Sequence, residues 1–162
     1  MEITQTFVES WRRQCACLND LAGLVTEDVA NLKPSDDGMP LSEQLCHTQV
    51  VRLEWFSRVS GTEPELSWLY TKQGETWVAS TDLEEIRRQL KLSGELIEQW
   101  LTTALPEGKP SGGYDHPAFF LQHMIWHEGW HIGLIMLGLR LAGKAPTDEW
   151  EEEHLWGRWR TE

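Results

Sequence analysis

The strongest constraint on the fold of this chain is the histidine pattern in residues 117–143, which read PAFFLQHMIWHEGWHIGLIMLGLRLAG. His123, His127 and His131 recur every four residues. An α-helix turns about 100° per residue, so residues four apart share one face. Apolar residues fall on the same side, namely Phe120, Met124, Leu134, Leu137, Gly138 and Leu141. The run therefore predicts a helix that carries three histidines in a core-facing stripe.

A stripe of buried histidines has two interpretations. Each ring nitrogen of a neutral imidazole needs a partner, because an unmatched buried polar group costs about 1–3 kcal/mol. Hydrogen bonds to other core groups meet that need one histidine at a time. A divalent metal meets it for several at once, and zinc or nickel suits an imidazole set. The pattern favours the metal and leaves the hydrogen-bonded core as the alternative.

Length, charge and cysteine content limit the class of protein. A chain of 162 residues can bury a sizeable core without disulfides, and we expect residues 1–162 to form a single domain. The three cysteines, an odd and sparse count with no signal sequence ahead of them, favour the reducing cytoplasm. No segment approaches the ~20 apolar residues of a membrane span. A net charge of -12 argues against a nucleic-acid partner.

Three amphipathic segments precede the histidine run. Residues 3–32 place apolar side chains at alternating steps of three and four, which predicts a long first helix. A second helix is expected from Ser42, as its N-cap, to about Gly61. A capping box at residues 81–84 opens a third, which is expected to end before Pro106. The prediction is an all-α four-helix bundle.

Two segments lack a helical period. Residues 61–80 are polar, contain Trp68 and Trp77, and give no convincing strand signal. We expect them to form a long connection between helices two and three that covers one end of the bundle. The tail, residues 144–162, combines acidic residues with three tryptophans and is expected to form a short packed segment.

The side of the fourth helix that lies opposite the histidines is also apolar. Its residues are Leu121, Ile125, Ile132, Met136 and Leu139. A helix that is apolar nearly all round is usually buried on both sides. We therefore expect this side to meet the tryptophan-rich tail or a second subunit, and we favour a homodimer.

A metal site in a bundle is built from facing helices, so the histidine stripe needs a ligand from another helix. His47 lies on the predicted second helix, whereas the remaining histidines lie at a helix entry and in the tail. The predicted ligands are His47, His127 and His131. Glu54 follows His47 by seven residues, on the same face, and is placed to hold its second ring nitrogen or a bound water.

These residues resemble the DinB-like four-helix bundles, also called the YfiT-type metal-dependent hydrolase superfamily. The resemblance spans essentially the whole chain and rests on His47 and on the run His123-x3-His127-x3-His131. In that family the metal is held by the helix-two histidine and the last two histidines of the run, which correspond to His47, His127 and His131. Many members carry a glutamine shortly after the last histidine, where this chain has Leu134.

The resemblance also implies a class of activity. Relatives include transferases and isomerases that use low-molecular-weight thiols such as bacillithiol, mycothiol or glutathione, and many are homodimers. It implies a metal-dependent thiol S-transferase or hydrolase acting on a small molecule, with Glu54 or Glu128 assisting proton transfer. The site is expected beneath the connection of residues 61–80, with Trp68 and Trp77 as pocket walls or simply as loop anchors. A metal-stabilised stress or binding protein is the non-enzymatic alternative.

A third interpretation comes from residues 127–131, which read HEGWH and match the HExxH signature of zinc proteases. Glu128 would then be the general base. The longer metzincin form fails, because Leu134 and Leu137 stand where glycine and histidine are required. Such proteases also place a strand-containing domain beside the helix, and no strand is predicted here. The protease is the least favoured of the three functions.

Overall fold

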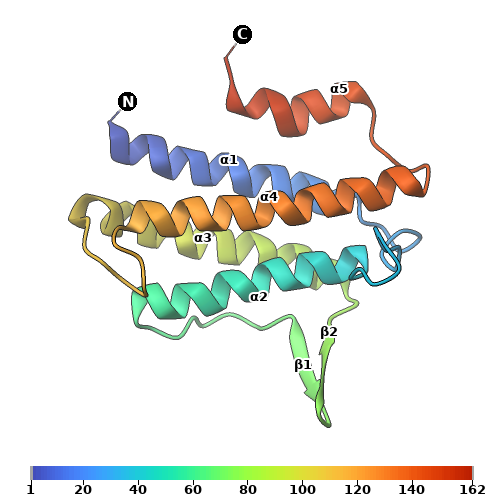
Figure 1. Cartoon of the computed structure of the whole chain (residues 1–162), viewed down its shortest axis with the longest axis horizontal. Helices are drawn as coiled ribbons and strands as arrows, with labels where there is room; N and C mark the ends of the chain where they lie inside the picture. Colours follow the sequence, from blue (N-terminus) through green and yellow to red (C-terminus); the bar gives the residue numbers. More distant parts are fainter. Residues whose placement is uncertain (1, 162) are drawn as a thin grey trace.

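Four long helices form the body of the structure (Figure 1). The computed structural model describes residues 2–161. In chain order the elements are α1 (Ile3–Leu24), α2 (Leu41–Ser60), β1 (Tyr70–Gln73), β2 (Thr76–Ala79), α3 (Leu83–Glu107), α4 (Pro117–Leu141) and α5 (Asp148–Glu151), then a π-helical segment (Glu152–Trp156) and a 3-10 turn (Gly157–Trp159). The predicted all-α bundle is confirmed. Within residues 2–161, no helix has both the length and the hydrophobicity needed to cross a membrane.

The order of the helices around the bundle decides which side chains can meet. α1 packs against α3 and α4, and α2 packs against the same two helices, so α1 and α2 lie diagonally across the bundle. Figure 1 shows α2 and α4 running side by side. A site that draws ligands from these two neighbours is therefore possible.

Local signals account for four of the eight ends of the long helices. The Asp82 side chain accepts hydrogen bonds from two backbone N–H groups in the first turn of α3. Pro117 occupies the first turn of α4, where its missing N–H is not needed. Gly61 and Gly108 end α2 and α3 with φ of 70° and 62°, a conformation that favours glycine. α3 runs past Pro106, contrary to the prediction, because a proline near the C-terminal end disturbs only the last turn.

The first helix is shorter than predicted, since α1 ends at Leu24 and not at residue 32. The chain then forms a turn in which the Ala30 N–H donates to the Thr26 carbonyl. Val25 and Val29 remain buried in this turn. The apolar spacing therefore continues beyond the end of the helix, which is why the sequence pattern overestimated its length.

The connection between α2 and α3 contains a β-hairpin, so the expectation of no strand was wrong. β1 and β2 pair antiparallel, with Tyr70 opposite Ala79. Gly74 takes a φ of 63° in the two-residue loop between them, as tight hairpins require. Both strands are largely exposed on both faces. They therefore lack the alternation of apolar and polar residues that marks a half-buried strand.

The core consists of two apolar clusters separated by buried polar residues. Each long helix contributes at least one buried polar residue between the two clusters. Four of them, one from each helix, are referred to below as the polar layer: Gln14, Arg52, Ser93 and Glu128. All four are at most 4% exposed. A buried polar group must find partners, so this layer restricts how the helices can pack.

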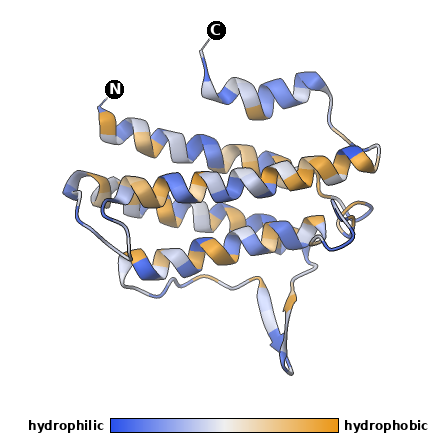
Figure 2. Ribbon diagram, viewed as in Figure 1, coloured by the Kyte–Doolittle hydropathy of each residue, from blue (hydrophilic) through white to orange (hydrophobic). Residues whose placement is uncertain are grey.

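The C-terminal segment packs on α1 (Figure 1), and it reaches α4 through the Arg140–Glu151 ion pair and through Leu155, which shares a core cluster with Met136. Of the residues expected to need cover, Leu121, Met136 and Leu139 are buried within the chain. Apolar residues recur along the whole of α4 (Figure 2), and a different set is exposed. This set, the α4 stripe, is Phe119, Trp126, Trp130, Leu137 and Leu141, at 61, 67, 62, 44 and 69% exposure. The last two were predicted to face the core, and that prediction was wrong.

Candidate metal centre

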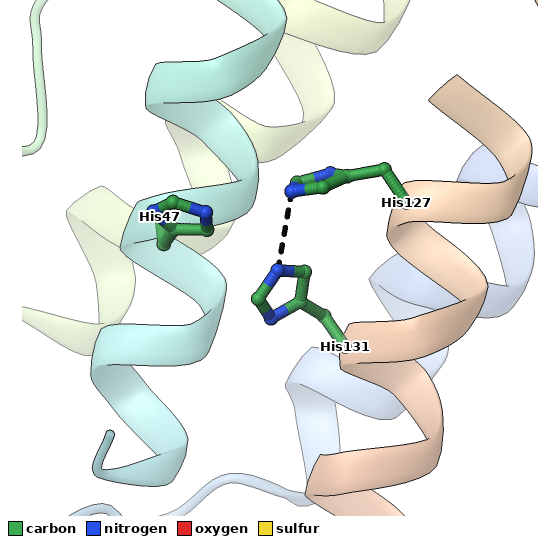
Figure 3. A group of neighbouring side chains, drawn as sticks. All are labelled: His47, His127 and His131. Atoms are coloured by element: carbon green, nitrogen blue, oxygen red, sulfur yellow. Dashed lines mark hydrogen bonds between the residues drawn. The ribbon is translucent and has the colours of Figure 1, made fainter. Parts of the chain in front are cut away.

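Three histidines from two neighbouring helices converge at mid-bundle (Figure 3). His47 comes from α2, and His127 and His131 come from successive turns of α4. One nitrogen from each lies within 4.8 Å of the others. The Nε2 atoms of His127 and His131 are 3.2 Å apart. The structure thus brings together the three residues that the sequence proposed as ligands.

Gln44 sets the orientation of His131. The Gln44 amide nitrogen donates to the Met39 carbonyl, so its Oε1 is the acceptor that faces His131 Nδ1. Nδ1 must then carry the proton, and the lone pair of His131 lies on Nε2, which faces the other two rings (Figure 3). A hydrogen bond of this kind to the outer nitrogen is typical of a histidine that binds a metal through the inner one.

The spacing of the inner ring nitrogens is compatible with a divalent ion. Two imidazole nitrogens bound to one tetrahedral ion at 2.0–2.1 Å lie about 3.3 Å apart, close to the observed separation of His127 and His131. The buried Nδ1 of His127, on the other side of the ring, has no hydrogen-bond partner within residues 2–161. An ion bound through Nε2 would not change that, so the metal interpretation rests on the convergence of the three inner nitrogens.

The three imidazoles are neutral at physiological pH. Burial, with added repulsion from neighbouring imidazoles, lowers the pKa of His131 to about 3 and that of His127 to about 4. Burial also lowers the pKa of His47, while the nearby carboxylates of Glu43 and Glu54 oppose that shift. A neutral imidazole is the form that binds metal, so the metal-free site is already in the required protonation state.

A pocket of about 350 Å³ lies beside His47, on the side of α2 that faces the hairpin connection. Trp68, Tyr70 and Trp77 line it from the connection, and Val50, Val51 and Glu54 line it from α2. The expectation that the two tryptophans would wall a pocket next to the site is therefore met. Glu54 is half-exposed and accepts a hydrogen bond from Arg58 at 2.6 Å. No hydrogen bond joins it to His47 within residues 2–161.

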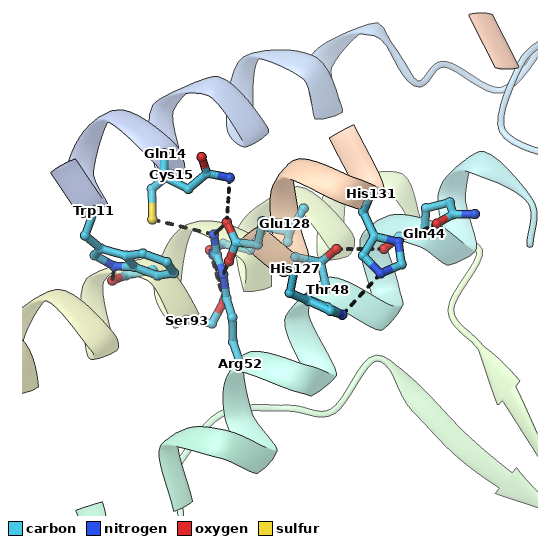
Figure 4. Close-up of polar contacts among 12 residues, drawn as sticks. Trp11, Gln14, Cys15, Gln44, Thr48, Arg52, Ser93, His127, Glu128 and His131 are labelled. Atoms are coloured by element: carbon cyan, nitrogen blue, oxygen red, sulfur yellow. Dashed lines mark hydrogen bonds and ion pairs between the residues drawn. The ribbon is translucent and has the colours of Figure 1, made fainter. Parts of the chain in front are cut away.

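Glu128 lies neither in this pocket nor in the histidine cluster. Its carboxylate forms a bidentate ion pair with Arg52 of α2, with Nε–Oε1 and Nη2–Oε2 distances of 2.6 and 3.0 Å (Figure 4). Gln14 donates to the same carboxylate. Both charged side chains are at most 1% exposed. A general base in the HExxH arrangement must face the metal and its water, so the structure does not support the protease interpretation or a proton-transfer role for Glu128.

The ion pair connects all four long helices through the polar layer. Besides Glu128 of α4, Arg52 donates to the Leu90 carbonyl and the Ser93 hydroxyl of α3. From α1, Cys15 accepts a weak hydrogen bond at 3.5 Å, and the Trp11 ring stacks on the guanidinium at 4.9 Å. Because Arg52 and Glu128 follow His47 and His127 on the same helices, the pair also aligns the two elements that supply the ligands.

The other histidines have separate roles. His123 Nδ1 hydrogen-bonds to the Tyr114 hydroxyl at 2.6 Å, and its ring packs edge-on against Trp55. His116 caps the N-terminus of α4. His154 pairs with Asp20 in the contact between the tail and α1. For these three residues an ordinary hydrogen bond is a sufficient explanation.

The fold and the cluster define a helical bundle with a three-histidine site suited to a metal ion. Residues 6–135 match the DinB superfamily, and the chain belongs to that family. No curated protein and no solved structure gave a significant match.

Two important residues were missed by reasoning from the sequence. Gln44 precedes His47 by three residues, which places both on one face of α2, and that spacing could have identified it. Arg52 gave no signal of its own, because nothing in the sequence indicates which carboxylate a buried arginine will meet. Leu134 cannot make the polar contact of a glutamine, whereas Gln44 supplies a glutamine contact to His131.

The metal centre predicts a specific pattern of metal content. Purified protein is expected to bind about one divalent ion per chain, and His47→Ala and His131→Ala to lose it, as measured by elemental analysis. Gln44→Leu is expected to weaken metal binding about 10–100-fold, because His131 loses its orienting partner. Protons should displace the ion only well below pH 6.5, since the metal-free pKa values of His127 and His131 are already low.

His123→Ala and His154→Ala serve as matched controls and should retain the metal, because neither residue belongs to the cluster. Equal metal content in His47→Ala and the wild type would show that α2 supplies no ligand.

Breaking the buried Arg52–Glu128 pair is expected to destabilise the fold much more than breaking an exposed ion pair. Arg52→Met should lower the free energy of unfolding by about 3–5 kcal/mol, because Glu128 is left buried and unpaired. Adding Glu128→Leu should recover much of that loss, as urea denaturation of the metal-free protein would show. Arg58→Met, which breaks the exposed pair with Glu54, should cost only about 0–1 kcal/mol. Similar losses for the two single variants would contradict the assigned role of the polar layer.

Proposed function

We propose that this protein is a metal-dependent enzyme that transfers a low-molecular-weight thiol to a small electrophile, or hydrolyses a related substrate. The observation that carries the proposal is the convergence of three neutral imidazoles beside a pocket that also contains a carboxylate. We assign zinc or nickel as the metal, with His47, His127 and His131 as ligands. Three free cysteines within the described chain support a reducing, cytoplasmic location and a single-domain enzyme that needs no disulfide.

A divalent ion held by three neutral ligands keeps its positive charge and open positions, and it lowers the pKa of a thiol or water that it binds. Glu54 is the proton acceptor in this proposal, because it shares the pocket with His47. Arg58 bonds its Oε1, which leaves Oε2 to take the proton. In the transfer reaction the S–H bond breaks, the proton passes to Glu54, sulfur bonds to the electrophilic carbon, and the leaving group departs with its electrons. Water replaces the thiol in the hydrolytic variant.

The hairpin connection supports binding of a substrate with an apolar part. Trp68 and Trp77 are 44 and 61% exposed and line the pocket opposite α2. Exposed aromatic faces bind apolar groups and exclude water from the reacting atoms. Tyr70 is held in the same wall by a hydrogen bond from its hydroxyl to Glu43. The connection would thus position the electrophile over the metal.

A non-enzymatic protein stabilised by its metal is the second candidate. One observation favours it: the ligands lie on two different helices, so a bound ion would cross-link α2 and α4. The two functions differ in what metal removal does to the fold.

The test is an assay of thiol transfer from bacillithiol, mycothiol and glutathione to an electrophile such as monochlorobimane, with zinc- or nickel-loaded protein. His131→Ala and chelated protein should lose turnover while circular dichroism shows that helicity is retained. Glu54→Gln should lower kcat/KM about 10²-fold or more, as expected for loss of a general base. Glu9→Gln is the matched control, since Glu9 also pairs with an arginine four residues on but lies outside this pocket.

Two results would count against the enzyme. If no thiol or ester substrate turns over, or if chelation melts the bundle, the structural ion becomes the better account.

We also propose that the protein is a homodimer and that the α4 stripe forms its interface. The five side chains expose on the order of 600 Å² of surface, most of it apolar. That area approaches the ~800 Å² that each partner contributes to a standard interface, and it lies at the upper end of the ~300–600 Å² typical of the largest apolar patch on a monomer. The stripe runs straight along α4, as a helix that pairs with its own copy requires.

Light scattering at micromolar concentration should give a dimer for the wild type and a monomer for the double variant Trp126→Glu, Trp130→Glu, because each glutamate would bury a charge in the interface. Trp77→Glu alters an equally exposed tryptophan outside the stripe and should remain dimeric. A monomeric wild type would contradict the proposal, and so would a double variant that stays dimeric.

A further inference from the structure

A second pocket lies on the other side of α4 from the histidine cluster. It has a volume of about 270 Å³ and is enclosed by α1, α4 and the C-terminal segment. Its apolar lining consists of Ile132, Met136, Leu155, Trp156 and Trp159. The two tryptophans are 56 and 42% exposed, so part of each ring is uncovered. The volume suits a molecule with one or two rings and lies just below the ~300–1,000 Å³ of most ligand pockets.

Two glycines of α4 also line this pocket. Gly129 and Gly133 lie one turn apart in the interior of the helix, where glycine lowers helix stability. Neither has a positive φ, and a Cβ built on either would meet no atom within 4 Å. Neither backbone conformation nor packing within the chain therefore requires glycine here. Their effect is to leave the helix backbone open, so that a flat ring can lie against it.

One buried polar side chain supplies a specific contact. Gln14 is 4% exposed, and its Nε2 donates to the Glu128 carboxylate. Because a carboxylate only accepts, this bond fixes which end of the amide is the oxygen. Figure 4 shows Gln14 Oε1 turned away from the ion pair, and it has no hydrogen-bond partner within residues 2–161. Since Gln14 lines the pocket, this oxygen is available to accept a hydrogen bond from a ligand there.

The charges around the pocket cancel. Arg140 and Glu151 form an ion pair at 2.5 Å, and both line the pocket. Cys17, also in the lining, is a free cysteine that is 3% exposed. The pocket therefore offers no unpaired charge to a ligand.

We propose that this pocket binds a small, neutral aromatic molecule that carries one N–H or O–H donor. The donor bonds to Gln14 Oε1, and the ring lies between the tryptophans of the tail and the exposed backbone at Gly129 and Gly133. This site is separate from the metal centre and does not depend on the proposed thiol chemistry.

The probe for the test is indole, whose N–H can donate to Gln14, and the comparison is 1-methylindole, which has the same ring system without the donor. Calorimetric titration of the metal-loaded full-length protein should show indole binding about five- to tenfold more tightly, the usual effect of one hydrogen bond. Equal affinity for the two probes would overturn the role of Gln14, and no binding of indole up to its solubility would overturn the site.

Gly129→Leu locates the site without depending on activity. A Cβ at this position would meet no atom within 4 Å, and Gly129 lines the pocket, so the leucine should occupy the pocket; the variant is expected to fold, keep its metal and fail to bind indole. Gly23→Leu is the matched control, because Gly23 is an exposed helix glycine on α1 with equally open surroundings, outside this pocket. It should bind indole as the wild type does. Indole binding by Gly129→Leu at wild-type affinity would place the probe elsewhere and refute the proposal.

Discussion

The Arg52–Glu128 ion pair is the interaction on which the rest of the structure depends. Removing two charges from water costs several kcal/mol per ion, and the pair can persist only if every donor and acceptor finds a partner. Here the partners come from α1 and α3 as well as from α2 and α4. Apolar cores tolerate sliding of one helix along another, because one hydrophobic contact replaces another at little cost. The polar layer does not tolerate such sliding, so it fixes the positions of the four helices along their axes relative to one another.

The metal centre depends on this fixed axial alignment of α2 and α4. His47 precedes Arg52 by just over one turn of α2, and His127 is next to Glu128 on α4. A shift of α4 against α2 by one turn would move a ligand by about 5.4 Å, more than the separation of the ligand nitrogens. The ion pair is therefore a structural requirement of the site, although neither residue faces the three rings. The glutamate of the HExxH match forms this contact between α2 and α4.

The sequence predicts those parts of the structure that depend on local periodicity. Four helices and the face shared by His127 and His131 follow from spacing alone, and His47 follows from counting the histidines on other helices. Features that depend on tertiary partners could not be predicted. The partner of Arg52 and the exposure of Leu137 each require knowledge of which helices are neighbours. The hairpin was missed because Tyr70–Gln73 and Thr76–Ala79 are short and exposed on both faces.

Three consecutive residues of α4 face three different environments. His127 faces the metal cluster, Glu128 faces the polar layer, and Gly129 faces the pocket under the tail. The 100° between successive residues is what separates these directions. A one-residue insertion or deletion just before His127 would rotate all three side chains away from these environments. A change of length in the loops would not. The middle of α4 is therefore the part of the chain whose length is least free to vary, even where individual side chains can be exchanged.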